Sequence, residues 1–251
     1  MNQPIIFTRY LYIKDEVETA LTLSLINQEK SCLFWAYELY YSGFQQELFG
    51  LLWKIFEDYY SSALNPNFKK YFTKKQKEWE NSLNTPEKDI VVGNIVYNLM
   101  RRTTTTIPND HKTQPTVMNK EKRLYVVLNE EELSVYKTIV STKEIRHWQI
   151  LKKALLHSTN ESSSLHLFPL NRKTLSYEEL TNLYWYHWEY FASFSPVWKE
   201  RIDKYGGVLS HDERKVVFED DDMLEEFYSK YGYEPCQQPK EIREKNIPLI
   251  V

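Results

Sequence analysis

A helical period in the apolar residues most constrains what this chain can fold into. Within the aromatic-rich segment 11–66, apolar side chains recur at i, i+4, i+7 and i+11, which places them on one helix face: Leu48, Leu52, Ile55 and Tyr59. The nine residues 33–41 (Leu-Phe-Trp-Ala-Tyr-Glu-Leu-Tyr-Tyr) carry a single charge. Such a segment belongs in a core or at an interface. This part of the chain is therefore predicted to be helical and packed.

Glycine is scarce, which limits the kinds of ligand loop that the chain can build. The 251 residues include six glycines, and Gly206-Gly207 is the one adjacent pair. Loops that cradle phosphate groups bring several glycines close together. The sequence therefore argues against a P-loop, a dinucleotide-binding turn and a kinase glycine-rich loop.

Capping residues indicate where helices begin and end. Three dipeptides are typical of an N-cap followed by proline at the first helical position: Asn65-Pro66, Thr85-Pro86 and Ser195-Pro196. Three glycines stand where helices are expected to stop: Gly43, Gly206 and Gly232. With the apolar periodicity, these signals predict helices over residues 5–27, 30–42, 44–63, 66–82, 86–102, 130–140, 142–158, 176–194, 196–205 and 220–231.

Short β-segments are the other expected elements. Residues 124–128 are consistent with a strand, and residues 208–209 with 216–218 can form a hairpin around residues 211–213. These segments are too short to change the fold class. We therefore predict a mainly α protein, built as an irregular helical bundle or a short helical array with at most a small β-hairpin.

A threonine-rich stretch divides the sequence. Residues 103–122 contain six threonines, two prolines and no aromatic residue, so they bury too little apolar surface to offset their ordering entropy. We expect a flexible linker there, between helical regions at residues 1–102 and 123–251. The sequence leaves open whether these regions form one domain or two.

Charge and cysteine content narrow the class of protein. The formal net charge is −3 and charged residues are 27% of the chain, which fits neither a disordered tail nor a polybasic nucleic-acid domain. No run approaches the ~18 apolar residues that span a bilayer, and early charges interrupt any signal-peptide pattern. Two distant cysteines, Cys32 and Cys236, make neither a zinc site nor a disulfide framework. We expect a soluble intracellular protein with no membrane partner.

The sequence contains only weak patterns for a catalytic or a metal-binding site. His187 and Glu189 are two positions apart on a predicted helix and do not face each other. The run Glu219-Asp220-Asp221-Asp222 has the composition of a metal cluster, but an acidic first helical turn explains it through the helix dipole. We therefore predict a protein that is not an enzyme, with no cofactor and no metal site, although residues distant in sequence can still converge in space.

Residues 67–77 combine positive charge with aromatic rings. Phe68, Tyr71 and Phe72 are interleaved with five lysines and no acid: Lys69, Lys70, Lys74, Lys75 and Lys77. Basic groups with stacking rings suit single-stranded nucleic acid. A solvated helix face, with the rings inward and the lysines outward, explains the same pattern. The sequence leaves both interpretations open.

Aromatic residues between positions 183 and 194 favour an interaction protein. They cover nearly every face of the predicted helix: Tyr184, Trp185, Tyr186, Trp188, Tyr190 and Phe191. Such a helix is buried in a core or covered by a partner, and Tyr and Trp often anchor interfaces. We predict a non-catalytic interaction or scaffold protein that binds another protein. The alternative is a nucleic-acid-binding accessory factor that uses the five lysines. The sequence names neither the partner nor the oligomeric state.

Two stretches resemble an uncharacterised family encoded by nucleocytoplasmic large DNA viruses. They are residues 33–43 with 51–55 and Asn65-Pro66, and residues 231–238. The likeness runs from about residue 7 to 247, with 103–122 variable. It implies a viral protein of the host cytoplasm or virion that serves replication, transcription or assembly, and it implies no site residue. The family's tail is acidic after Glu-Pro, whereas Cys236 and Gln237 stand here. The first half is also similar to the helical collar of clamp-loader and related AAA+ proteins.

Overall fold

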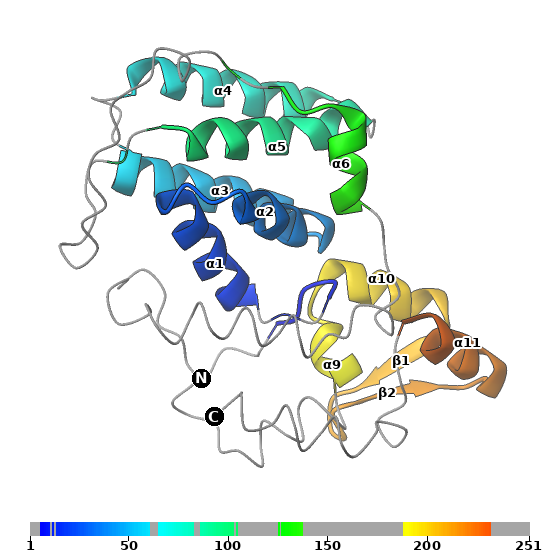
Figure 1. Cartoon of the computed structure of the whole chain (residues 1–251). Coiled ribbons are helices and arrows are strands. Elements are labelled where there is room, and N and C mark those ends of the chain that lie inside the picture. Colours follow the sequence, from blue (N-terminus) through cyan, green and yellow to red (C-terminus); the bar gives the residue numbers. More distant parts are fainter. Residues whose placement is uncertain are drawn as a thin grey trace. The chain divides into compact units, whose positions relative to one another are not determined.

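A computed structural model describes residues 6–10, 12, 14–60, 65–82, 86–102, 104, 125, 127–137 and 188–231 (Figure 1). Its elements, in chain order, are α1 (Lys14–Ile26), α2 (Ser31–Tyr41), α3 (Gln45–Ile55), the π-turn η1 (Phe56–Tyr60), α4 (Pro66–Asn81), α5 (Pro86–Met100), α6 (Glu130–Lys137), α9 (Trp188–Ala192), α10 (Pro196–Lys204), β1 (Gly207–Ser210), β2 (Lys215–Phe218) and α11 (Asp221–Tyr231). The described part is mainly helical with one antiparallel pair of strands, which confirms the predicted fold class.

The chain divides into two compact units. One contains residues 20–40 and 45–138, and the other contains residues 1–19, 41–44 and 139–251. We call them the α4 unit and the hairpin unit. Two boundaries fall within α1 and at the end of α2, and the other two fall just before α3 and just after α6. The sequence-based division at residues 103–122 stays a prediction.

Helices of the α4 unit pack side by side. Figure 1 shows α4 lying along α5, with α3 and α2 beneath them. Most of α2 is buried, which agrees with its single charged residue. Its buried residues are Cys32, Leu33, Trp35, Ala36, Tyr37, Glu38, Leu39 and Tyr40. The predicted face of α3 is also buried at Leu48, Leu52 and Ile55.

The fourth position predicted for that face is wrong by one residue. Tyr59 is only half-buried, whereas Tyr60 is fully buried and its hydroxyl donates to the Leu25 carbonyl at 2.8 Å. The cause is η1, because a π-turn takes more residues per turn than an α-helix and shifts the inward face along the chain. The predicted helix over 44–63 is therefore α3 followed by a π-turn, with residues 61–64 outside the described residues.

Two strands and three helices form the core of the hairpin unit. The strands pair antiparallel, with Gly207 opposite Phe218 and Ser210 opposite Lys215, as the sequence predicted. Helices α9, α10 and α11 pack against this hairpin. Its buried core is largely aromatic: Phe7, Trp188, Tyr190, Phe191, Ala192, Trp198, Ile202, Tyr205, Phe218, Phe227 and Tyr231.

The first predicted helix, 5–27, begins later than expected. The described residues before Lys14, 6–10 and 12, form no helix; instead the Thr8 amide donates to the Tyr12 carbonyl and the Lys14 amide donates to the Ile6 carbonyl. Backbone carbonyls of this segment serve α10, because Trp198 Nε1 donates to the Thr8 carbonyl at 2.8 Å. A carbonyl used in this way is not available for a helical ladder.

Some predicted boundaries agree and others fail. Ser195 caps α10, since its Oγ accepts from the Trp198 amide, and Gly43 and Gly206 have φ of 96° and 72° at helix ends. Asn65 does not cap α4 with its side chain, which instead donates to the Tyr60 carbonyl. The described residues of segment 124–128 lie in no strand. Outside the described residues lie Thr85, Gly232, the predicted helix 142–158 and most of the helix 176–194.

Candidate interaction surface

Aromatic rings hold α4 in place from its inner side. Phe68, Phe72 and Trp79 recur at helical spacing and are buried. They meet rings of the preceding elements: Phe56 at 5.4 Å, Trp53 at 4.0 Å and Phe49 at 4.6 Å between centroids, respectively. Trp53 and Phe72 are stacked with an interplanar angle of 2°. Aromatic pairs of this kind add about 0.5–1.5 kcal/mol each beyond area burial, so the outer face of α4 is fixed in position.

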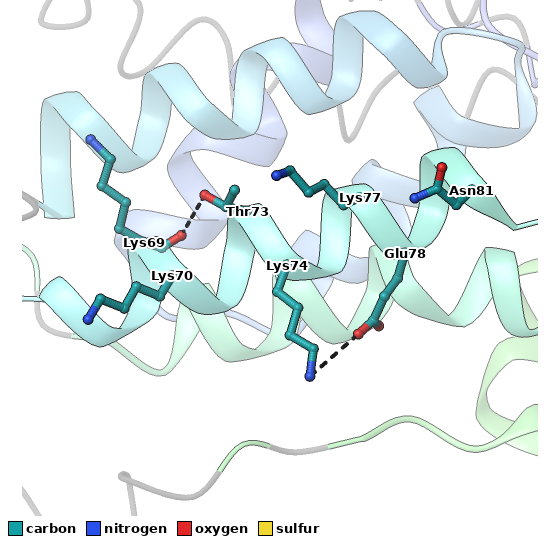
Figure 2. Close-up of a pocket in the computed structure, with 7 residues that line it drawn as sticks. All are labelled: Lys69, Lys70, Thr73, Lys74, Lys77, Glu78 and Asn81. Carbon is teal, nitrogen blue, oxygen red and sulfur yellow. Dashed lines mark hydrogen bonds and ion pairs between the residues drawn. The ribbon is translucent and has the colours of Figure 1, made fainter.

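Lysines occupy that outer face. Lys69, Lys70, Lys74 and Lys77 are exposed, and the side chain of Lys74 is 77% accessible. Figure 2 shows Lys69 and Lys77 directed to one side of the helix, and Lys70 and Lys74 to the other. We call these four residues the lysine face. The structure thus gives the arrangement in which rings pack inward and lysines extend outward into solvent.

A shallow depression of about 650 Å³ runs over this face. Seven residues line it, all from α4: Lys69, Lys70, Thr73, Lys74, Lys77, Glu78 and Asn81. Because one helix supplies the whole lining, the depression can receive the side of another chain but does not enclose a small molecule. Three lining residues, Thr73, Glu78 and Asn81, were not predicted from the sequence, although they follow Lys69, Lys74 and Lys77 by one helical turn.

Lys75 and Glu78 set the edge of the lysine face. Lys75, the fifth predicted residue, is 26% accessible and its Nζ lies 2.6 Å from Glu78 Oε2. Glu78 also reaches Lys74, at 3.9 Å. Lys75 therefore belongs to an ion pair beside the depression rather than to its lining. A carboxylate within the cationic surface weakens its attraction for any anion, and it offers an acceptor for a basic side chain of a protein partner.

The rings that suggested nucleic-acid binding do not lie on the lysine face. Phe68 and Phe72 are buried, and Tyr71 is half-buried with its ring stacked on Tyr125 at 3.9 Å. Stacking of bases needs an accessible ring face beside the cations. The lysine face therefore offers charge without the rings that the alternative requires.

The acidic run 219–222 caps a helix. Asp220 Oδ1 accepts from the Asp222 amide at 2.9 Å and from the Met223 amide at 3.3 Å, and α11 begins at Asp221. No group of three or more His, Cys, Asp or Glu residues in the described part of the chain could hold a metal ion. Of the other suggested pair, Glu189 is buried and accepts a hydrogen bond from the Tyr228 hydroxyl, while His187 lies outside the described residues.

A buried polar network, unforeseen from the sequence, joins the helices beneath α4. The Tyr40 hydroxyl donates to Asp89 Oδ1 and accepts from Trp79 Nε1, both at 3.0 Å. The Tyr37 hydroxyl donates to the Asp89 carbonyl and accepts from the Gly93 amide, both at 3.1 Å. Burial raises the pKa of both phenols above the ordinary value. Both hydroxyls are occupied by structural hydrogen bonds and stay protonated, so this network supports the fold rather than acid–base chemistry.

Cys32 is equally inert. It is fully buried in α2, and burial raises the pKa of its thiol to about 12. A nucleophilic cysteine needs a lowered pKa and access to solvent. Cys236 lies outside the described residues.

Comparison with protein-family models, with curated proteins and with solved structures gives no match. Among the described helices, none combines the length and apolar character required to cross a bilayer.

Proposed function

We propose that this protein works by binding another protein, without catalysis, and that the lysine face of α4 is the surface it uses. One observation carries the proposal: four exposed lysines are presented on a helix whose opposite side is fixed by packed aromatic rings. The partner surface that fits is acidic. The proposal extends the expectation of an interaction or scaffold protein, and the viral resemblance makes a role in viral replication, transcription or assembly part of it.

Physical reasoning favours a protein partner over a nucleic acid. Lysine is a point charge on a flexible stem, and it lacks the planar fork with which arginine grips phosphate groups. Glu78 lines the same surface, and no ring of the segment 67–77 is exposed on it. Nucleic-acid binding through Lys69, Lys70, Lys74, Lys75 and Lys77 is therefore kept as an outcome of the test.

Fluorescence anisotropy with two labelled probes tests the proposal. The probes are poly-L-glutamate, as an acidic polypeptide, and a short oligothymidylate. The test variant is Lys69→Gln/Lys70→Gln/Lys74→Gln/Lys77→Gln. The matched control makes the same change of net charge elsewhere: Lys199→Gln/Lys204→Gln/Lys215→Gln/Lys230→Gln.

We expect the test variant to bind poly-L-glutamate about tenfold more weakly than the unchanged chain. Exposed ion pairs contribute up to ~1 kcal/mol each, and 1.4 kcal/mol is a factor of ten. The control should change affinity by less than about twofold. Equal losses in both variants would show that net charge alone drives binding and would refute the assignment. Tighter binding of oligothymidylate, lost in the test variant, would replace the proposal with the nucleic-acid alternative.

A further inference from the structure

The hairpin unit carries a surface with the opposite charge to the lysine face. Helix α11 directs Leu224, Phe227 and Tyr231 toward the aromatic core of its unit. Its other side exposes four carboxylates: Asp221, Asp222, Glu225 and Glu226. The one basic residue of the helix is Lys230. α11 is thus an amphipathic helix with an anionic outer side.

Helix capping explains the position of only two of these four carboxylates. Asp221 and Asp222 lie in the first turn, where the helix dipole favours negative charge. Glu225 and Glu226 lie one turn further along, beyond that effect. They repeat the first two positions at i+4, and like charges at this spacing destabilise a helix. Across the described residues, no ion pair reaches any of the four carboxylates.

The lysine face has the same unfavourable arrangement with the opposite sign. Lys70 and Lys74 are four positions apart, and Lys74 and Lys77 are three apart. Within the described ranges, Lys69, Lys70 and Lys77 form no ion pair. Each helix therefore carries rows of like charge. A helix of opposite charge lying beside it would offset the repulsion within each row.

We propose that α11 of a second copy of this chain occupies the lysine face of α4. This inference rests on the proposed function and identifies its acidic partner. Both rows have helical spacing, about 6 Å for each step of four residues, so two helices lying side by side bring carboxylates opposite lysines over more than one turn. The contact is made of exposed charges, so the association is weak, reversible and sensitive to salt.

Sedimentation velocity of the full chain tests this inference. One variant, Lys69→Glu/Lys70→Glu, reverses charge at two exposed positions of α4 and leaves its buried rings unchanged. The other, Glu225→Lys/Glu226→Lys, reverses charge on α11 beyond its capping turn. We expect the unchanged chain to self-associate in about 50 mM salt, with the association constant falling at least about tenfold in about 500 mM salt.

Each variant alone should sediment as a monomer, and an equimolar mixture of the two should associate again. In the mixture, the unaltered α11 of the first variant can pair with the unaltered α4 of the second, so the native contact is available. The two altered helices also carry opposite charges at their reversed positions. A monomeric unchanged chain in low salt, association that survives both reversals, or a mixture that fails to associate would each overturn the inference. Because poly-L-glutamate binding is measured separately, these outcomes leave the proposed function standing.

Discussion

Tyr40 joins three helices through one hydroxyl group. It lies on α2, receives a hydrogen bond from Trp79 of α4 and gives one to Asp89 of α5, whose Oδ2 lies 3.4 Å from Lys137 Nζ. A buried hydroxyl that both donates and accepts cannot be removed without leaving a donor unsatisfied. The network therefore determines how α4, and with it the lysine face, is held.

Replacing this hydroxyl should measure that role. We expect Tyr40→Phe to lower the free energy of unfolding by about 1–3 kcal/mol, because Trp79 Nε1 would be buried without an acceptor. The matched control is Tyr97→Phe on α5, a half-buried position, which should change stability by less than about 0.5 kcal/mol. Urea unfolding followed by circular dichroism measures both. Equal effects in the two variants would contradict the assigned role.

Buried phenols also predict how stability depends on pH. Burial raises the pKa of Tyr71 to about 12, and it raises the pKa of Tyr37, Tyr40 and Tyr60 further in the same direction. The unfolded value is about 10, so the folded state holds protons that the unfolded state releases. The stabilisation that these retained protons give the folded state is complete below about pH 10, and it is lost as the pH rises through about 12. Urea unfolding at several alkaline pH values should show a free energy of unfolding that falls as the pH rises. A free energy that does not change with pH would refute the burial of these tyrosines.

At the scale of elements, replacing either of two glycines with alanine should change stability in opposite directions. Gly43 ends α2 with φ of 96°, and an added Cβ would lie 2.5 Å from Pro196 Cβ. Gly50 lies within α3 with nothing within 4 Å of an added Cβ. We expect Gly43→Ala to cost at least about 2 kcal/mol, and Gly50→Ala to stabilise by about 0.5–1 kcal/mol. Thermal unfolding checks both signs, and a stabilising Gly43→Ala would be incompatible with this structure.

Periodicity and capping were enough to predict most described elements but not their exceptions. Proline at the start of α4 and α10 and the buried face of α3 follow from local rules. The shift from Tyr59 to Tyr60 does not, because a π-turn is stabilised by tertiary packing around Tyr60. The non-helical backbone at residues 6–10 likewise depends on Trp198, 190 positions away from its acceptor Thr8.

The candidate surface was also only partly predictable. The sequence identified five lysines, and four of them line the depression. It did not show that Lys75 differs from the other four, because its ion pair with Glu78 depends on where the two side chains lie on the helix. The inward direction of Phe68 and Phe72 was one of two open interpretations. Contacts with Trp53 and Phe56, from a separate helical segment, decide between them.

At the scale of the whole molecule, the chain carries two charged helical faces of opposite sign. Each belongs to a compact unit whose own aromatic core fixes the helix: stacked rings under α4, and the cluster around Phe227 under α11. Exposed aromatic surface, which first suggested an interaction protein, is limited to Tyr125 among the large hydrophobic residues exposed in the described part. Charge, rather than exposed rings, therefore carries the proposed binding.

Residue-resolved acetylation of lysines tests that claim most directly. The full chain is treated briefly with an acetylating reagent, with and without poly-L-glutamate, and each lysine is quantified by mass spectrometry. We expect poly-L-glutamate to protect Lys69, Lys70, Lys74 and Lys77, and we expect Lys199 and Lys215 to react equally in both samples. Equal reactivity of the lysine face in the two samples, or protection confined to other lysines, would contradict it.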